Sequence, residues 1–155
     1  MPDRPLLLCY DGSDDAKHAI DEAARLFPRA ETLVLSVSQT VQALPALAWS
    51  PGPVVGAQDL FTAMHDAAQR MAEEGARLAS GAGLEATPLT ADAEGPVWAA
   101  IVETAAARDV AAIVIGSRGL SGVRSLLLGS VSSGVVHNAR EPTVVVRRSD
   151  DAAGA

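Results

Sequence analysis

The sequence lacks several features that would place it in common protein classes. It contains a single cysteine, Cys9, so it cannot form an intramolecular disulfide. No apolar run approaches the roughly 18 residues of a membrane-spanning helix, and no basic segment leads into a short apolar one as in a secretory signal peptide. We therefore expect a cytoplasmic protein without a membrane partner, in which Cys9 is a small buried residue of a strand.

The sequence also lacks an excess of basic charge. It has 12 lysine and arginine residues against 19 aspartate and glutamate residues, which gives a net charge of −7 and a pI of about 4.8. A surface that binds a polyphosphate backbone normally carries a basic face. Nucleic acid is therefore not an expected partner.

The usual signatures of catalysis and of metal binding are absent as well. There is no G-x-x-x-x-G-K-[ST] sequence, and no G-x-G-x-x-G follows the first apolar run. No cysteine or second histidine lies near any of the three histidines in the sequence, and no serine has an evident histidine partner. The sequence thus predicts no metal site and offers no catalytic residue.

The sequence does contain enough apolar residues to form the core of one small domain. Hydrophobic residues make up 48% of the 155 residues, and a chain of this length usually folds as a single domain. We expect that domain to span residues 1–148. The short polar tail, residues 149–155, is expected to be flexible.

Short apolar runs alternate with segments of helical periodicity, which predicts an α/β fold. Helices separating strands imply right-handed crossovers and a parallel sheet covered on both faces, a three-layer α/β/α sandwich. The expected strands are Leu6–Tyr10, Thr32–Val37, Glu85–Thr90, Ile113–Ile115 and Thr143–Val146, and the expected helices are Asp14–Leu26, Ala57–Ser80, a segment opened by Pro96, and Ser130–Asn138.

Two features of the middle of the chain qualify this scheme. The long helix is expected to bury one stripe of residues, namely Leu60, Met64, Ala67, Ala68, Met71 and Leu78. The preceding segment, Gln42–Gly56, carries three prolines and is predicted to be an irregular loop. Trp49 in that loop either covers a ligand or partner, or belongs to a mobile apolar flap.

The most informative stretch lies between the last two strands. A buried strand stops at Gly116, Gly119 follows, and Gly129 and Ser130 then open a helix that has no acid in its first turn. Glycines let a backbone approach a ligand, and the free N–H groups of a helix start attract an anion. The helix that starts at Asp14 carries two acids and would repel phosphates. Ser130 either donates to a phosphate or simply caps its helix.

The spacing G-x2-G-x9-G-S of these residues closely resembles the ATP-binding signature of the universal stress protein family. Two more segments resemble family motifs: Leu6–Ala16, with its D-G-S turn, and Glu94–Pro96, which precedes the fourth strand. The resemblance extends from Pro5 to Arg147, with Ala16 standing where the family often has serine. It implies the adenine nucleotide alpha hydrolase-like fold, with a five-stranded parallel sheet in the order 3-2-1-4-5.

The resemblance also implies a set of site residues and a ligand, ATP, with a divalent cation (Mg or Mn) possible beside it. At the switch point between strands 1 and 4, Asp11 would contact the nucleoside, although an aspartate before glycine often only forms an Asx turn. By the same resemblance Val37, Ile115 and Gly116 would line the adenine. The ribose and phosphates would be held by Gly119, Gly129, Ser130, Val131 and Ser132.

The function implied is that of an ATP-binding sensor or regulatory domain in stress response, and at most a slow ATPase. One alternative is a dimeric interaction module of the same fold that does not bind nucleotide; another is an enzyme of the wider superfamily, for which no acceptor site is evident. In the implied strand order Thr143–Val146 is an edge strand, so a homodimer through this strand is expected. The tail or the arginines at 147 and 148 would otherwise protect the edge.

Overall fold

The structure is a computed structural model that describes residues 4–39, 56–119 and 128–148. The predicted irregular loop up to residue 55, including Trp49, and the tail from residue 149 lie outside the described residues.

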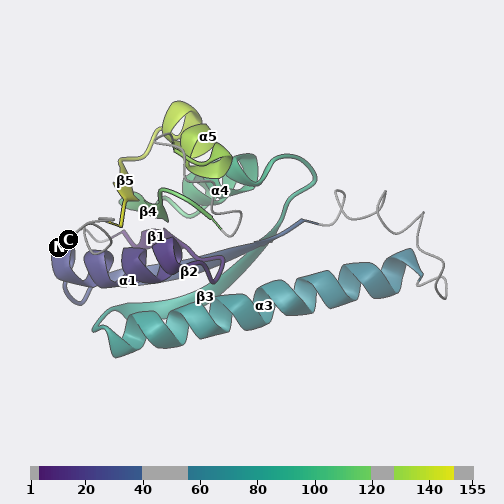
Figure 1. Ribbon diagram of the computed structural model, residues 1–155, viewed down its shortest axis with the longest axis horizontal. Helices are drawn as coiled ribbons and strands as arrows, with labels where there is room; N and C mark the ends of the chain where they lie inside the picture. The colour runs from purple at the N-terminus through teal and green to yellow at the C-terminus, as the bar shows by residue number, and fades with distance from the viewer. Residues whose placement is uncertain (1–3, 40–55, 120–127, 149–155) are drawn as a thin grey trace, which may run out of the picture.

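A single parallel sheet forms the centre of the molecule (Figure 1). Its five strands lie in the order β3-β2-β1-β4-β5, and all neighbouring pairs run parallel. This confirms the predicted order. The bounds are β1 Leu6–Cys9, β2 Glu31–Ser38, β3 Glu85–Asp92, β4 Ala112–Gly116 and β5 Thr143–Val146.

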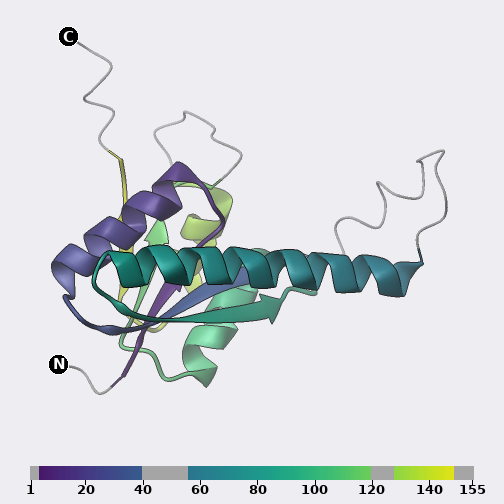
Figure 2. The ribbon, with the colours of Figure 1, turned by 90° about the horizontal axis from the view of Figure 1, so that it is seen from below.

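Two helices cover each face of the sheet, which confirms the three-layer arrangement (Figures 1 and 2). Helices α1 (Asp14–Leu26) and α3 (Ala57–Gly81) lie on one face, and α4 (Val97–Ala107) and α5 (Ser130–Asn138) lie on the other. Each face has its own hydrophobic cluster. Because side chains alternate along a strand, β1 sends Leu8 into the α1 and α3 cluster and Leu7 into the α4 and α5 cluster.

The buried stripe of α3 differs from the predicted one. Leu78 is 41% exposed, and the residues that pack against the sheet are small: Ala68, Ala72, Gly75, Ala76 and Ala79. A Cβ on Gly75 would lie 2.7 Å from the ring of Tyr10, so the helix approaches closer than larger side chains would allow. The prediction was right for Ala68, which is buried, and for Met71, which packs against the core, but it wrongly included Leu78 and missed the small residues from Ala72 to Ala79. The N-terminal part of α3 extends past the sheet (Figures 1 and 2).

Element boundaries agree closely with the sequence pattern elsewhere. Helices α1 and α5 have the predicted bounds, while β2 and β3 are longer at their carboxyl ends than predicted. Pro96 is the N-cap of α4 and not a residue of its first turn, since its ψ of 143° is extended. Because the sheet is parallel, the carboxyl ends of β1, β2 and β4 lie at the same edge, where the candidate site is found.

Candidate functional site

A cavity of about 520 Å³ opens at the carboxyl ends of β1, β2 and β4. Parallel sheets open a crevice there because the connections after neighbouring strands leave in opposite directions at the switch in strand order. The structure places all nine residues predicted for the site on the wall of this one cavity: Asp11, Val37, Ile115, Gly116, Gly119, Gly129, Ser130, Val131 and Ser132.

The turn after β1 is a hydrogen-bonded Asx turn. The Oδ1 atom of Asp11 accepts the backbone N–H of Ser13 at 2.9 Å, and Gly12 adopts a φ of 81° that favours glycine. Ser13 is the N-cap of α1, and its hydroxyl accepts the N–H of Ala16 at 3.2 Å. Only one carboxylate oxygen of Asp11 is used in the turn. The other, Oδ2, lies 2.8 Å from the position that a Cβ on Gly119 would take.

The segment from Gly116 to Gly129 is called the glycine loop. Ser117, directly after β4, joins the two ends of this loop. Its carbonyl oxygen accepts the N–H of Gly129 at 2.8 Å and the hydroxyl of Ser132 at 2.9 Å. Its own hydroxyl donates to Oδ2 of Asp15 at 3.0 Å, and its N–H donates to the carbonyl of Val146 at 2.8 Å. One buried residue therefore connects β4, β5, α1 and α5.

The glycines of the loop are close to other parts of the protein rather than in unusual backbone conformations. None of Gly116, Gly119 and Gly129 has a positive φ. A Cβ on Gly116 would lie 2.9 Å from the carbonyl carbon of Asp15, so this glycine allows β4 to pack against the start of α1. A Cβ on Gly129 would lie 3.2 Å from the carbonyl oxygen of Ser117. These glycines therefore let parts of the protein pack closely against one another, and the predicted approach of the loop to a ligand stays a prediction.

The start of α5 has no acidic residue and no side-chain cap. Gly129 is the N-cap, and Ser130 is the exposed first residue of the helix, so capping does not explain Ser130. By contrast, α1 carries Asp14 and Asp15 in its first turn. The positive end of the α5 dipole is therefore uncompensated by its own first turn and faces the cavity, which suits an anion.

Residues 4–147 match the model of the universal stress protein family. The chain belongs to this family.

Two full-length relatives support the assignment. The chain is 29% identical over 148 residues to the universal stress protein YxiE of Bacillus subtilis, covering 92% of this chain and 97% of the relative. It is 33% identical over 151 residues to a universal stress protein of Thermus aquaticus, with 93% and 98% covered.

Solved structures share the fold of this universal stress protein. The hypothetical protein MJ0577 superposes with a TM-score of 0.76 at 21% identity, covering 95% of this chain and 97% of the other. A universal stress protein in complex with cAMP gives a TM-score of 0.61 at 22% identity, with 94% and 98% covered. The Archaeoglobus fulgidus protein in complex with dAMP gives 0.59 at 22% identity, with 94% and 99% covered. No helix in the described part of the chain is long and apolar enough to cross a membrane.

The rest of the cavity wall in this family member is largely apolar. Met64, Ala68 and Met71 of α3 line it on one side, and Val97 and Ile101 of α4 line it on the other. Side chains of this kind suit the faces of a flat ring and leave recognition to a few polar groups.

The two titratable side chains at the end of β1 are uncharged at neutral pH. Burial, with a smaller contribution from the charge of Asp11, raises the pKa of the Cys9 thiol to about 12. Burial also raises the pKa of Tyr10, and its hydroxyl donates to Oε1 of Glu74 at 2.7 Å. The described residues contain no group of three His, Cys, Asp or Glu side chains that could hold a metal ion.

Sequence reasoning missed the role of Asp15. It considered Asp15 only as one of two acids that would repel phosphates, whereas the carboxylate accepts both the hydroxyl of Ser117 and the backbone N–H of Arg118, at 3.0 and 3.1 Å. The available signal was the strand order, since β1 beside β4 puts the first turn of α1 next to the residue that follows Gly116.

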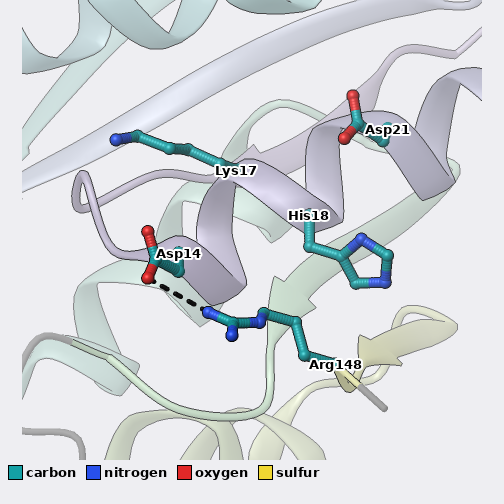
Figure 3. A pocket seen from close by; sticks show the side chains of 5 residues that line it. All are labelled: Asp14, Lys17, His18, Asp21 and Arg148. Atoms are coloured by element: carbon teal, nitrogen blue, oxygen red, sulfur yellow. Dashed lines mark ion pairs between the residues drawn. The ribbon is translucent and has the colours of Figure 1, made fainter. Parts of the chain in front are cut away.

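A second, shallow depression lies on the outer side of α1 and is separate from the cavity (Figure 3). It is lined by Lys17, His18 and Asp21, together with Asp14 and Arg148, which form an ion pair at 3.1 Å from the start of α1 to the end of β5. Both side chains of the pair are substantially exposed, so it contributes little to stability.

The neighbouring acids Asp14 and Asp15 provide a matched test of the Ser117 junction. Both lie in the first turn of α1 and interact with its dipole, but only Asp15 accepts the Ser117 hydroxyl. Asp15→Ala should lower the free energy of unfolding by about 1–3 kcal/mol, because it leaves a buried donor without this acceptor. Asp14→Ala should lower it by about 0–1 kcal/mol. Urea denaturation measures both, and equal losses would show that the junction adds nothing.

Proposed function

We propose that this universal stress protein binds ATP in the cavity at the ends of β1, β2 and β4, and that it acts in the cytoplasm as a nucleotide-dependent sensor or regulatory domain in stress response. The observation that carries the proposal is that the two ends of the cavity differ in chemistry. Apolar walls from α3 and α4 form one end, and the acid-free start of α5 forms the other. The cAMP and dAMP complexes of proteins with this fold support an adenine nucleotide as the ligand.

The chemistry of the walls sets the orientation of the nucleotide. The base lies at the apolar end, beside Val37 and Ile115, because burying an aromatic ring there removes apolar surface from water. The phosphates lie at the start of α5, where Ser130, Val131 and Ser132 occupy the first turn and present N–H groups that have no partner within the helix. The N–H of Gly129 already donates to Ser117, so the helix supplies the phosphate contacts.

A divalent cation, Mg or Mn, would accompany the phosphates and be held mainly by their oxygens and by water. This fits a described chain that offers no metal cluster of its own. The cation would neutralise phosphate charge. The described cavity wall offers no histidine as a general base, which supports a slow ATPase at most and a protein that acts through binding.

The domain spans residues 1–148 and assembles as a homodimer through β5. In the described sheet β5 is an edge strand. The N–H of Ile113 donates to the carbonyl of Pro142, and the N–H of Ser117 donates to that of Val146. Since successive residues of a strand turn their peptide groups to opposite sides, Val144 and Val146 face β4, and Val145 presents its N–H and C=O at the open edge. A second copy of β5 would satisfy those groups.

Replacement of Gly129 tests the phosphate end. Gly129→Val should abolish ATP binding, because a Cβ at the N-cap of α5 would lie 3.2 Å from the carbonyl oxygen of Ser117 and would displace the helix start that holds the phosphates. The φ of Gly129, −60°, is one that valine adopts. Gly95→Val is the control, since a Cβ there meets nothing within 4 Å. Calorimetric titration of folded variants measures the affinity for ATP. An unchanged affinity in Gly129→Val would contradict the proposal that the phosphates lie at the start of α5. Mass spectrometry of the denatured wild-type protein tests independently for co-purified adenine nucleotide.

Two replacements of Asp11 separate its role in the turn from its role in binding. Asp11→Ala should cost about 1–3 kcal/mol of ATP binding, the range for a hydrogen bond to a charged group. It should also lower the melting temperature, because the Asx turn to Ser13 is lost. Asp11→Asn keeps an oxygen for the turn and should restore the melting temperature but not the full affinity. An Asp11→Ala protein that binds ATP like the wild type would limit Asp11 to shaping the turn.

Proline replacements in β5 test the dimer. Val145→Pro should shift the protein from dimer to monomer and weaken ATP binding less than assembly, since the N–H that it removes faces the open edge. Val144→Pro is the contrasting variant: it removes an N–H that faces β4 and should destabilise the fold itself. Sedimentation at micromolar concentration provides the measurement. A monomeric wild type rules out the dimer, and a Val145→Pro protein that stays dimeric assigns the interface to another surface.

A further inference from the structure

Two serines on the same face of β2 differ in one respect. Ser36 and Ser38 both line the cavity, and each is 4% exposed. The hydroxyl of Ser36 donates to the carbonyl oxygen of Tyr10 at 2.7 Å. The hydroxyl of Ser38 is buried and has no hydrogen-bond partner among the described residues.

A buried hydroxyl without a partner is costly and calls for an explanation. Leaving such a group unpaired costs about 1–3 kcal/mol in proteins, and native structures contain few of them. The backbone at this position is satisfied, since the carbonyl of Ser38 accepts the N–H of Ala93 at 2.8 Å. The side chain alone lacks a partner, so an alanine here would serve the strand equally well.

The position of Ser38 indicates which part of a ligand would supply the partner. Ser38 is the last residue of β2 and lies on the face of the strand that packs against α3, one of the two helices that contribute the apolar end of the cavity. The hydroxyl of Tyr10, directly after β1, already donates to Glu74, and that of Ser36 in β2 donates to the backbone. Gln39 is exposed. A nucleobase in this end buries its ring faces but also needs hydrogen bonds along its edge.

We propose that Ser38 is a base-recognition residue whose hydroxyl hydrogen-bonds the polar edge of a purine held at the apolar end of the cavity. This inference rests on the proposed function, because it requires a nucleotide in that cavity. The hydroxyl is shielded from solvent in the present rotamer, and rotation of χ1 to another staggered position redirects it. The hydroxyl is both a donor and an acceptor, so it can pair with a ring nitrogen or with an exocyclic amine.

The test compares Ser38→Ala with Ser36→Ala, using two probes in calorimetric titrations: ATP, and inorganic tripolyphosphate, which has no base. Ser38→Ala should weaken ATP binding by about threefold to tenfold, the effect of losing one hydrogen bond, and leave tripolyphosphate affinity unchanged. It should not lower the melting temperature of the ligand-free protein, since it removes an unpaired group. Ser36→Ala should lower that melting temperature by about 2–4 °C, because it removes a formed bond.

Each outcome is decisive. A wild-type protein that does not bind ATP refutes the proposed function, and the role of Ser38 with it. A wild-type protein that binds ATP, together with a Ser38→Ala protein of equal affinity, refutes the role of Ser38 alone. If Ser38→Ala weakens the binding of tripolyphosphate as much as that of ATP, the hydroxyl does not recognise the base. A lower melting temperature of ligand-free Ser38→Ala would show that the hydroxyl has a structural partner, and would also overturn the inference.

Discussion

The hydrogen bonds of Ser117 are the constraint on which the site depends. This one buried residue ties the end of β4 to β5 through its N–H, to α1 through its hydroxyl, and to the start of α5 through its carbonyl. The two ends of the glycine loop are thereby held together, and α5 begins at a fixed place beside the cavity. An anion site at a helix start is only as well defined as the position of that helix.

Close packing at glycine supports the same junction. Gly116 lets β4 approach the backbone of Asp15, which brings that carboxylate within reach of Ser117 and of the N–H of Arg118. On the other side of the cavity, Gly75 lets α3 approach the ring of Tyr10. Glycines of this sequence therefore act in two ways: a glycine such as Gly12 permits a left-handed turn, and others bring elements together.

Much of this arrangement could be predicted from the sequence, and the remainder shows where pattern reading ends. Alternating apolar runs and amphipathic segments predicted nine elements that the structure contains, and the family resemblance supplied the strand order. The buried stripe of α3 was only partly right, because hydrophobicity ranks Leu78 above Gly75 whereas close packing prefers the smaller residue. Asp15 was missed because its partners lie about a hundred positions away in the chain. The unpaired hydroxyl of Ser38 likewise cannot be recognised from the sequence alone.

The cavity lies across the two hydrophobic clusters, with walls from α3 on one face of the sheet and from α4 and α5 on the other. A molecule that fills it becomes part of the core of both helical layers. Folding and occupancy are then linked by mass action: a ligand at one hundred times its Kd adds about 2.7 kcal/mol to the free energy of unfolding. For a cavity placed in this way, the lifetime of the folded protein in the cell would itself report how much ligand is present.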